Sequence, residues 1–302
     1  MRRDLVVVRC GRRSQHPAWL EGTASRDFDL VRCAYEEAPA ASDLPAVDRT
    51  IPGQKWNGLH AFLGAWPGWR DYERIWLPDD DLGATAADVG RFLERCRLHD
   101  AALAQPALTD DSQWSHALTL SNAAFVSRAT TFVEVMAPCF RRDVLERLLP
   151  TFEASPSGAG WGLDDAWARL LEYRGLYVID ECPVRHDRPV GAHRSRADHR
   201  AAMAEMRRLH RRFGAAELRK TLAGLERTGT WIDASSGRFL PAYLGGYAAL
   251  LARKPVARRR LLRDQADDPA AWLRSASSRE RPDAPPPTVG WWRAIGRRLR
   301  GE

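Results

Sequence analysis

The sequence lacks the features that mark several common classes of protein. Its five cysteines are odd in number and widely spaced, with no Cys-x-x-Cys pair, so we expect buried thiols in a reducing compartment. A disulfide framework and a zinc site are both disfavoured. No apolar run approaches the roughly 18–20 residues that a membrane-spanning helix needs. The first apolar run, residues 5–8, is too short for a signal peptide, and we expect a cytoplasmic protein.

An excess of charge of one sign is also missing from most of the chain. The formal net charge is +7, and residues 251–302 alone carry thirteen Arg or Lys against six Asp or Glu. The rest of the chain is left with 33 of each sign and is balanced. The basic character therefore belongs to the tail, and we expect no nucleic-acid partner for the main part of the protein.

The chain is long enough, at 302 residues, to bury a substantial core. Strand-like runs alternate with helical patterns through its first third, which predicts an α/β fold with a largely parallel mixed sheet flanked by helices. We expect strands at residues 4–9, 28–35, 74–77, 102–108, 130–138 and 176–180, and helices at 53–63, 85–99, 141–149 and 166–173.

Three segments follow from this pattern. We expect one domain over residues 1–192 and a helical extension over residues 193–274. The extension begins with a long charged helix that runs to about residue 227. Residues 275–302 are predicted to form a linker rich in Pro and Arg, followed by a basic amphipathic tail.

The most informative stretch is Arg-Ile-Trp-Leu-Pro-Asp-Asp-Asp-Leu, residues 74–82. A buried strand ends here in Asp79, Asp80 and Asp81, at the edge where open α/β sheets bind ligands. Such carboxylates repel one another in a cleft unless a cation is bound between them, and oxygen ligands of this kind suit Mg²⁺ or Mn²⁺. The alternative is a solvated turn that helps to cap the next helix.

Two further features favour the metal site. The loop Gly-Trp-Gly-Leu-Asp-Asp, residues 160–165, carries a second pair of carboxylates, and His186 follows the last predicted strand. A nucleotide-sugar transferase of the GT-A type accounts for these features together. In it Asp79, Asp81 and His186 bind Mn²⁺ or Mg²⁺, and Asp164 or Asp165 is the base that activates the acceptor hydroxyl. His186 can equally be an ordinary loop histidine.

The same interpretation assigns residues to the two substrates. A cation must neutralise the charge that grows on the leaving diphosphate, and a tryptophan offers an apolar platform for a sugar ring. A carboxylate within an apolar strand needs a partner, either structural or on the acceptor. The predicted donor contacts are Gly11, Arg12, Lys55 and Asp80, and the predicted acceptor contacts are Glu134 and Trp161.

Four motifs in this order resemble those of a known family. They are Trp-Leu-Pro-Asp-Asp-Asp-Leu-Gly, Gln-Pro-Ala-Leu, Phe-Val-Glu-Val-Met-Ala-Pro and Gly-Trp-Gly-Leu-Asp. The chain is similar to domain-of-unknown-function family seven hundred and seven over roughly residues 1–192. That family is described as glycosyltransferase-like, so the resemblance implies a GT-A-like fold. The family's aspartate in the Gly-Trp-Gly loop matches Asp164, whereas Asp165 has no counterpart.

We therefore expect a metal-dependent and inverting glycosyltransferase. It would move a sugar from a nucleoside diphosphate sugar to a saccharide or lipid-linked acceptor, as in the assembly of surface polysaccharides. Two alternatives remain open. One is a phosphoesterase that uses the same carboxylates with a second set of metal ligands. The other is a carbohydrate- or membrane-binding protein that has the fold without turnover.

The end of the chain has its own pattern. Trp291, Trp292, Ile295 and Leu299 fall near one helical face with arginines around it, which is typical of a helix that binds an anionic membrane surface. We expect residues 289–300 to hold the protein at the inner face of the membrane. The alternatives are a helix packed on its own domain and a basic arm for nucleic acid, which the paired tryptophans disfavour.

Overall fold

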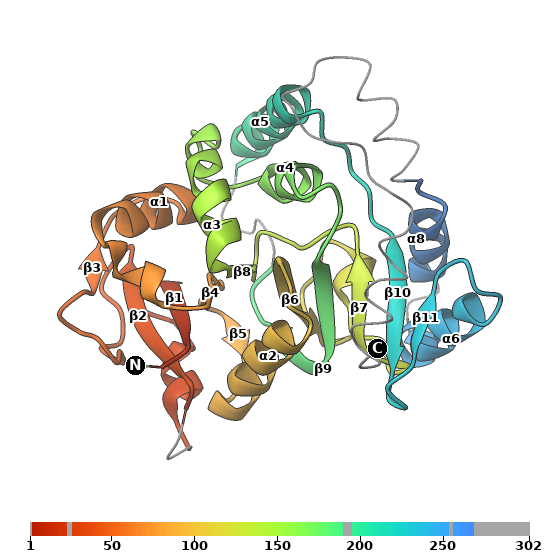
Figure 1. Cartoon of the computed structure of the whole chain (residues 1–302). Helices are drawn as coiled ribbons and strands as arrows, with labels where there is room; N and C mark the ends of the chain where they lie inside the picture. Colours follow the sequence, from red (N-terminus) through yellow and green to blue (C-terminus); the bar gives the residue numbers. More distant parts are fainter. Residues whose placement is uncertain (1, 23–25, 190–194, 254–255, 269–302) are drawn as a thin grey trace.

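The computed structural model of the chain describes residues 2–22, 26–189, 195–253 and 256–268 (Figure 1). They form a mixed sheet flanked by helices, which confirms the predicted α/β class. The strands are β1 Asp4–Cys10, β2 Phe28–Ala34, β3 Arg49–Thr50, β4 Arg74–Trp76, β5 Leu82–Gly83, β6 Leu103–Leu108, β7 Phe125–Thr130, β8 Cys139–Arg141, β9 Leu176–His186, β10 Thr221–Glu226 and β11 Trp231–Asp233.

The sheet has a parallel part and a mostly antiparallel part. Its order is β11-β10-β7-β9-β6-β8-β4-β1-β2-β3, and β5 pairs with the end of β9. Strands β3, β2, β1 and β4 pair in parallel, as does β6 with β9. The short β8 is antiparallel to both β4 and β6 and joins the two parts. Carboxyl ends of β4, β6 and β9 therefore meet near one another at one edge.

Helices cover both faces of the sheet (Figure 1). The helices are α1 Lys55–Ala65, α2 Ala86–Leu98, α3 Arg142–Leu148, α4 Leu163–Leu170, α5 Arg196–Phe213, α6 Phe239–Gly246, α7 Ala248–Arg253 and α8 Val256–Gln265, with 3₁₀ turns at His16–Leu20, Pro67–Asp71, Ala117–Thr119 and Leu149–Ala154. Successive side chains of β1 point to opposite faces of the sheet and pack into two separate hydrophobic clusters. Leu5 and Val7 join the cluster with α1, α3 and α4, while Val6 and Val8 join the one with α2 and α6–α8.

The predicted strand over residues 130–138 is wrong. β7 ends at Thr130 and β8 begins only at Cys139, with an irregular segment between them. The carbonyls of this segment accept from side chains and from the backbone N–H groups of Leu77 and Asp79 in the stretch that follows β4. Lys55 donates to those of Val135 and Met136, and the indole of Trp76 donates to that of Ala137. Apolar composition alone cannot reveal such partners.

The long helix predicted to reach residue 227 is too long. α5 begins at Ser195 and Asp198, which form a capping box, and it ends at Gly214 in the left-handed conformation (φ 59°). The chain then forms β10 and β11, which extend the sheet beyond β7. The described part of the predicted helical extension, residues 195–253 and 256–268, contains α5–α8 and also two strands that were not predicted.

Two other predictions concern the ends of the chain and membranes. The linker and the tail at residues 275–302 lie outside the described residues. Within the described part, no helix combines the length and the apolar content needed to cross a membrane.

Candidate active site

A pocket of about 840 Å³ opens at the carboxyl ends of the central strands. Its floor is the acidic turn after β4, and His186 at the end of β9 lies beside that turn. Arg9, Tyr35, Asp164 and residues of helix α5 also line the pocket. Residues far apart in the sequence, predicted to share one site, therefore line one cavity.

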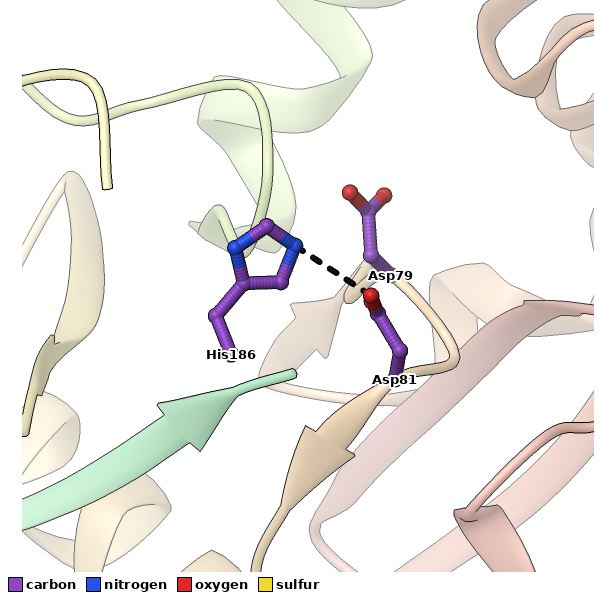
Figure 2. Close-up of side chains that lie close together, drawn as sticks. All are labelled: Asp79, Asp81 and His186. Carbon is purple, nitrogen blue, oxygen red and sulfur yellow. Dashed lines mark ion pairs between the residues drawn. The ribbon is translucent and has the colours of Figure 1, made fainter. Parts of the chain in front are cut away.

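Asp79, Asp81 and His186 come together as predicted (Figure 2). One ligand atom from each of them lies within 4.8 Å of the others. Nε2 of His186 is 3.3 Å from Oδ2 of Asp81, and Nδ1 of the same ring is 2.7 Å from the carbonyl oxygen of Gln113. A ring held at Nδ1 by a carbonyl presents Nε2 to the carboxylates, which is the usual arrangement of a metal-binding histidine.

Asp81 and His186 shift each other's pKa. Burial lowers the pKa of His186, but the hydrogen bond and the charge of Asp81 outweigh it and raise the pKa to about 9. Burial likewise raises the pKa of Asp81, yet His186 and Arg188 bring it below the usual value. The carboxylate is thus kept ionised, as a metal ligand requires, whereas His186 would have to give up the proton on Nε2 when a cation binds there.

Asp80 has a different role from its two neighbours. Its Oδ2 accepts from the backbone N–H of Gly11 at 2.8 Å, and its Oδ1 accepts from Nη2 of Arg188 at 2.7 Å. Burial raises the pKa of Asp80, and these donors oppose that effect. A side chain at Gly11 would meet the ring of Tyr35. Gly11 and Asp80 therefore bind each other and fix the acidic turn; their predicted contact with a donor stays a prediction.

Lys55 reaches the site but has no free donor. Its Nζ donates to Oδ1 of Asp79 at 2.7 Å and to the carbonyls of Val135 and Met136 at 2.9 and 2.8 Å. Burial lowers the pKa of Lys55, although Asp79 opposes the shift. An ammonium group has three donors, and all of them are used here. Lys55 therefore positions Asp79 in this structure, and its predicted contact with a diphosphate stays a prediction.

Arg12 does not lie where it was predicted. Its side chain is 69% exposed and pairs loosely with Glu37 at 3.5 Å, and it does not line the pocket. The chain turns sharply after β1, so that Arg12 is carried to the surface. Arg9 lines the pocket instead, but its guanidinium donates to the carbonyls of Ala34, Ile51 and Gly53 and is structural.

Asp164 and Asp165 lie in the first turn of α4, which begins three residues earlier than predicted. Asp165 is fully engaged, because Oδ1 is 2.5 Å from Nη1 of Arg219 and Oδ2 is 2.9 Å from Nε2 of His210. Asp164 has no ion pair among the described residues. Burial, the charge of Asp165 and the charge of Glu134 raise its pKa well above the usual value. Of the two predicted bases, Asp164 is the one that remains available.

Glu134 also lines the pocket, as predicted. Its backbone N–H donates to Oε1 of Gln105 at 2.6 Å, which fixes the turn that carries it. Its Oε2 is buried and has no hydrogen-bond partner among the described residues. Burial raises the pKa of Glu134 to about 7. An unpaired buried carboxyl oxygen of this kind is well suited to accept a hydrogen bond from a ligand.

Trp161 lines the pocket between two glycines with positive φ. Gly160 has a φ of 79° and Gly162 of 88°, and a Cβ at Gly160 would meet the ring of Trp56. Glu205 of α5 holds this loop, because its carboxylate accepts from the hydroxyls of Ser155 and Ser157. Trp161 is therefore carried by an anchored loop that lines the pocket.

Four pocket residues were missed in the sequence. Arg188 binds both Asp80 and Asp81, and Tyr35 is hydrogen-bonded to it. Arg219 is bonded to Asp165, and His116 lies beside Arg219. Only Arg188 carried a signal, since it follows His186 by two residues. The other three come from segments with no distinguishing motif.

No family model and no curated protein sequence matches the chain. Among solved structures, TarS of S. aureus is similar with a TM-score of 0.40 and 10% identity, over 88% of this chain and 54% of that one. The chain thus spans about half the length of TarS. A structure of residues 1–349 of TarS gives a TM-score of 0.39 and 10% identity, over 100% of this chain and 92% of that one.

A second protein is similarly distant. Glucosyl-3-phosphoglycerate synthase of Mycobacterium tuberculosis, solved with Mn²⁺, UDP-glucose and phosphoglyceric acid, has a TM-score of 0.41 and 12% identity, over 77% of this chain and 86% of that one. Likenesses this distant do not establish a function. The resemblance to domain-of-unknown-function family seven hundred and seven stays a prediction.

Proposed function

We propose that this protein is a metal-dependent glycosyltransferase of the GT-A type, which uses a nucleoside diphosphate sugar as donor. One observation supports this above all. A single pocket is lined by the Asp79, Asp81 and His186 cluster and also by Asp164, a carboxyl with a raised pKa and no ion pair among the described residues. Sugar transfer needs these two groups on opposite sides of the reacting carbon.

The donor set fits Mn²⁺ or Mg²⁺. Two carboxylate oxygens and one imidazole nitrogen converge, and the imidazole is oriented by Gln113. A bound divalent cation would neutralise the diphosphate of the donor. Among the residues that the structure describes, no second cluster of three such ligands is found. That supports a transferase over a phosphoesterase with a second set of ligands.

Arg188 is the protein's own cation at the donor end. It is 28% exposed at the rim of the pocket, between Asp80 and Asp81, whereas Arg12 lies outside and Lys55 has no free donor. We assign to Arg188 the contact with the leaving diphosphate that was predicted for Arg12 and Lys55. A guanidinium can bind two phosphate oxygens while it remains paired with a carboxylate.

Asp164 acts on the acceptor. Its carboxylate accepts the proton of the attacking hydroxyl, whose oxygen forms the new bond to the anomeric carbon. The bond from that carbon to the diphosphate oxygen breaks, and the electron pair leaves with the nucleoside diphosphate. Attack from the side opposite the leaving group inverts the anomeric carbon. Asp165 holds the base in place through its bonds to Arg219 and His210.

The acceptor itself is proposed to be a saccharide or a lipid-linked sugar, as in surface polysaccharide assembly. Glu134 and Trp161 would contact it, since both line the pocket that also holds Asp164. Attachment of residues 289–300 to an anionic membrane surface belongs to the same proposal and rests on the sequence alone. The resemblance to the family likewise rests on the sequence alone.

A donor panel tests this function. The full-length protein is incubated with Mn²⁺ and UDP-, GDP-, ADP- and dTDP-sugars. The nucleoside diphosphate released is measured with water alone and with an added sugar as the acceptor. We expect release from one nucleotide class, dependent on metal, and a loss of about 10²- to 10⁴-fold in Asp164→Asn. The matched control is Asp143→Asn on the surface. Metal-independent release, or full activity of Asp164→Asn, would overturn the assignment.

A further inference from the structure

The acceptor end of the pocket is rich in carboxylates. Glu134, Asp164 and Asp165 all lie there, and each is at least nine-tenths buried. Arg219 lies beside Asp165, and its Nη1 is already bonded to that carboxylate at 2.5 Å. Asp164, once ionised to act as the base, adds a negative charge that no ion pair among the described residues balances. A phosphate or a carboxylate on the acceptor would be repelled here, whereas a neutral sugar would not.

His116 supplies an uncharged donor to the same end. It lines the pocket, and its Nδ1 is 3.4 Å from Nε of Arg219. A guanidinium nitrogen can only donate, so Nδ1 is the acceptor and the proton of the neutral ring lies on Nε2. Nε2 has no hydrogen-bond partner among the described residues. Burial and the charge of Arg219 lower the pKa of His116 to about 3, so the ring stays neutral.

The ring is held firmly in this orientation. It packs edge-on against Phe132 with 4.8 Å between centroids, and the guanidinium of Arg219 lies 3.6 Å from the centroid of Phe132 on its face. The carbonyl of His116 accepts from the backbone and the hydroxyl of Thr119. His116 is thus a pre-positioned donor, and Glu134 with its unpaired Oε2 is a pre-positioned acceptor in the same pocket.

We propose that the acceptor is an uncharged sugar with a second hydroxyl beside the reacting one, and that this second hydroxyl donates to Glu134 and accepts from Nε2 of His116. The inference rests on the proposed function, because Asp164 must act on the reacting hydroxyl. It adds the substrate class: a vicinal diol in a neutral ring. His116 is then a residue that determines specificity and takes no part in proton transfer.

Two substitutions of His116 separate recognition from structure. In His116→Asn the side-chain oxygen can take the place of Nδ1 and keep the contact with Arg219, but no donor replaces Nε2. In His116→Gln the amide nitrogen reaches the place of Nε2. The probes are methyl glycosides of glucose, galactose and mannose, their 2-, 3- and 4-deoxy analogues, and the corresponding 6-phosphates. Affinities are measured by calorimetry on the full chain with Mn²⁺.

We expect at least one methyl glycoside to bind, and its 6-phosphate to bind about tenfold more weakly. One deoxy analogue should bind about tenfold more weakly than its parent glycoside, because it lacks one hydrogen bond to a buried group. His116→Asn should bind the parent glycoside more weakly than the wild type by a similar factor. For that deoxy analogue, the variant and the wild type should have the same affinity. His116→Gln should stay within about threefold of the wild type.

Several results would overturn the inference. They are tighter binding of a phosphate than of its neutral parent, equal losses in the Asn and Gln variants, and no binding of any glycoside. If the Asn variant fails to fold, the deoxy series on the wild-type protein decides alone. Binding of nucleoside diphosphates is measured on the same samples. Its absence contradicts the proposed function, whereas its presence without sugar discrimination contradicts only the inference about the acceptor.

Discussion

Nε2 of His186 lies 3.3 Å from Oδ2 of Asp81, although the two residues are more than a hundred positions apart in the sequence. The pairing of β5 with β9 brings them together, since Leu82 lies opposite His186 in that antiparallel pair. On its other side, the ring is fixed by Gln113. The sheet thus positions the proposed metal ligands by backbone pairing, and the surrounding side chains set their orientation and charge.

Lys55 is predicted to tune the metal site without binding the metal. Lys55→Met removes the hydrogen bond that holds Asp79, and affinity for Mn²⁺ should fall about 10- to 100-fold, as is usual for residues that orient a ligand. Calorimetric titration of Mn²⁺ measures it. Lys220→Met is the matched control, since Lys220 bonds a backbone carbonyl away from the cluster. Unchanged affinity in Lys55→Met would refute the positioning role.

Replacement by Asn should lower the free energy of unfolding at Asp165 but not at Asp164. Asp165→Asn breaks buried ion pairs with Arg219 and His210 and should lower the free energy of unfolding by about 3–5 kcal/mol. Asp164→Asn replaces a carboxyl whose ionisation is already disfavoured, so stability should not fall. Urea unfolding at pH 8 gives both values. Equal destabilisation would contradict the division of roles.

The raised pKa of Glu134 predicts that the stability of the protein depends on pH. Its pKa is raised from 4.5 to about 7 by burial, so the folded protein binds the proton more tightly than the unfolded chain. The stabilising contribution is complete below about pH 4.5 and is lost as the pH rises to about 7. Glu134→Gln should therefore match the wild type at pH 4.5 and be more stable by roughly 2–3 kcal/mol at pH 8. A constant difference across this range would contradict the shift.

Arg128 and Asp180 test a structural prediction away from the pocket. Both side chains are fully buried and paired at 2.9 Å, and Arg128 also bonds the hydroxyl of Tyr247. Arg128→Met leaves Asp180 unpaired and should cost about 3–5 kcal/mol. The double variant with Asp180→Leu should recover much of that loss. Thermal or urea unfolding measures it, and metal binding should not change in either variant.

Much of the site could be predicted from the sequence, because its ligands follow strands. Asp79 and Asp81 come at the end of an apolar run, and His186 comes at the end of another, so the strand topology brings them together. Asp164 was predicted as one of two bases. Which of the two is free depends on Arg219 and His210, which come from distant segments with no motif. Only tertiary contacts distinguish the two aspartates.

The errors in the fold have a similar cause. Residues 131–138 are apolar and were predicted as a strand, but their carbonyls serve Lys55, Asp79 and Trp76. The end of α5 was missed although Gly214 marks it, because the charged pattern continues past the glycine. Arg12 was predicted to reach the donor from its position after β1, and the direction of the turn carries it to the surface.

The central claim is that Asp79, Asp81 and His186 bind a metal that holds a nucleoside diphosphate. Thermal unfolding of the purified protein with Mn²⁺ and each of UDP, GDP, ADP and dTDP tests it directly, repeated with Asp81→Ala. A ligand that binds only the folded state raises the midpoint. We predict a rise with one nucleotide, only when Mn²⁺ is present, and no rise in Asp81→Ala. A midpoint unaffected by every nucleotide, or an equal rise in Asp81→Ala, would contradict the account.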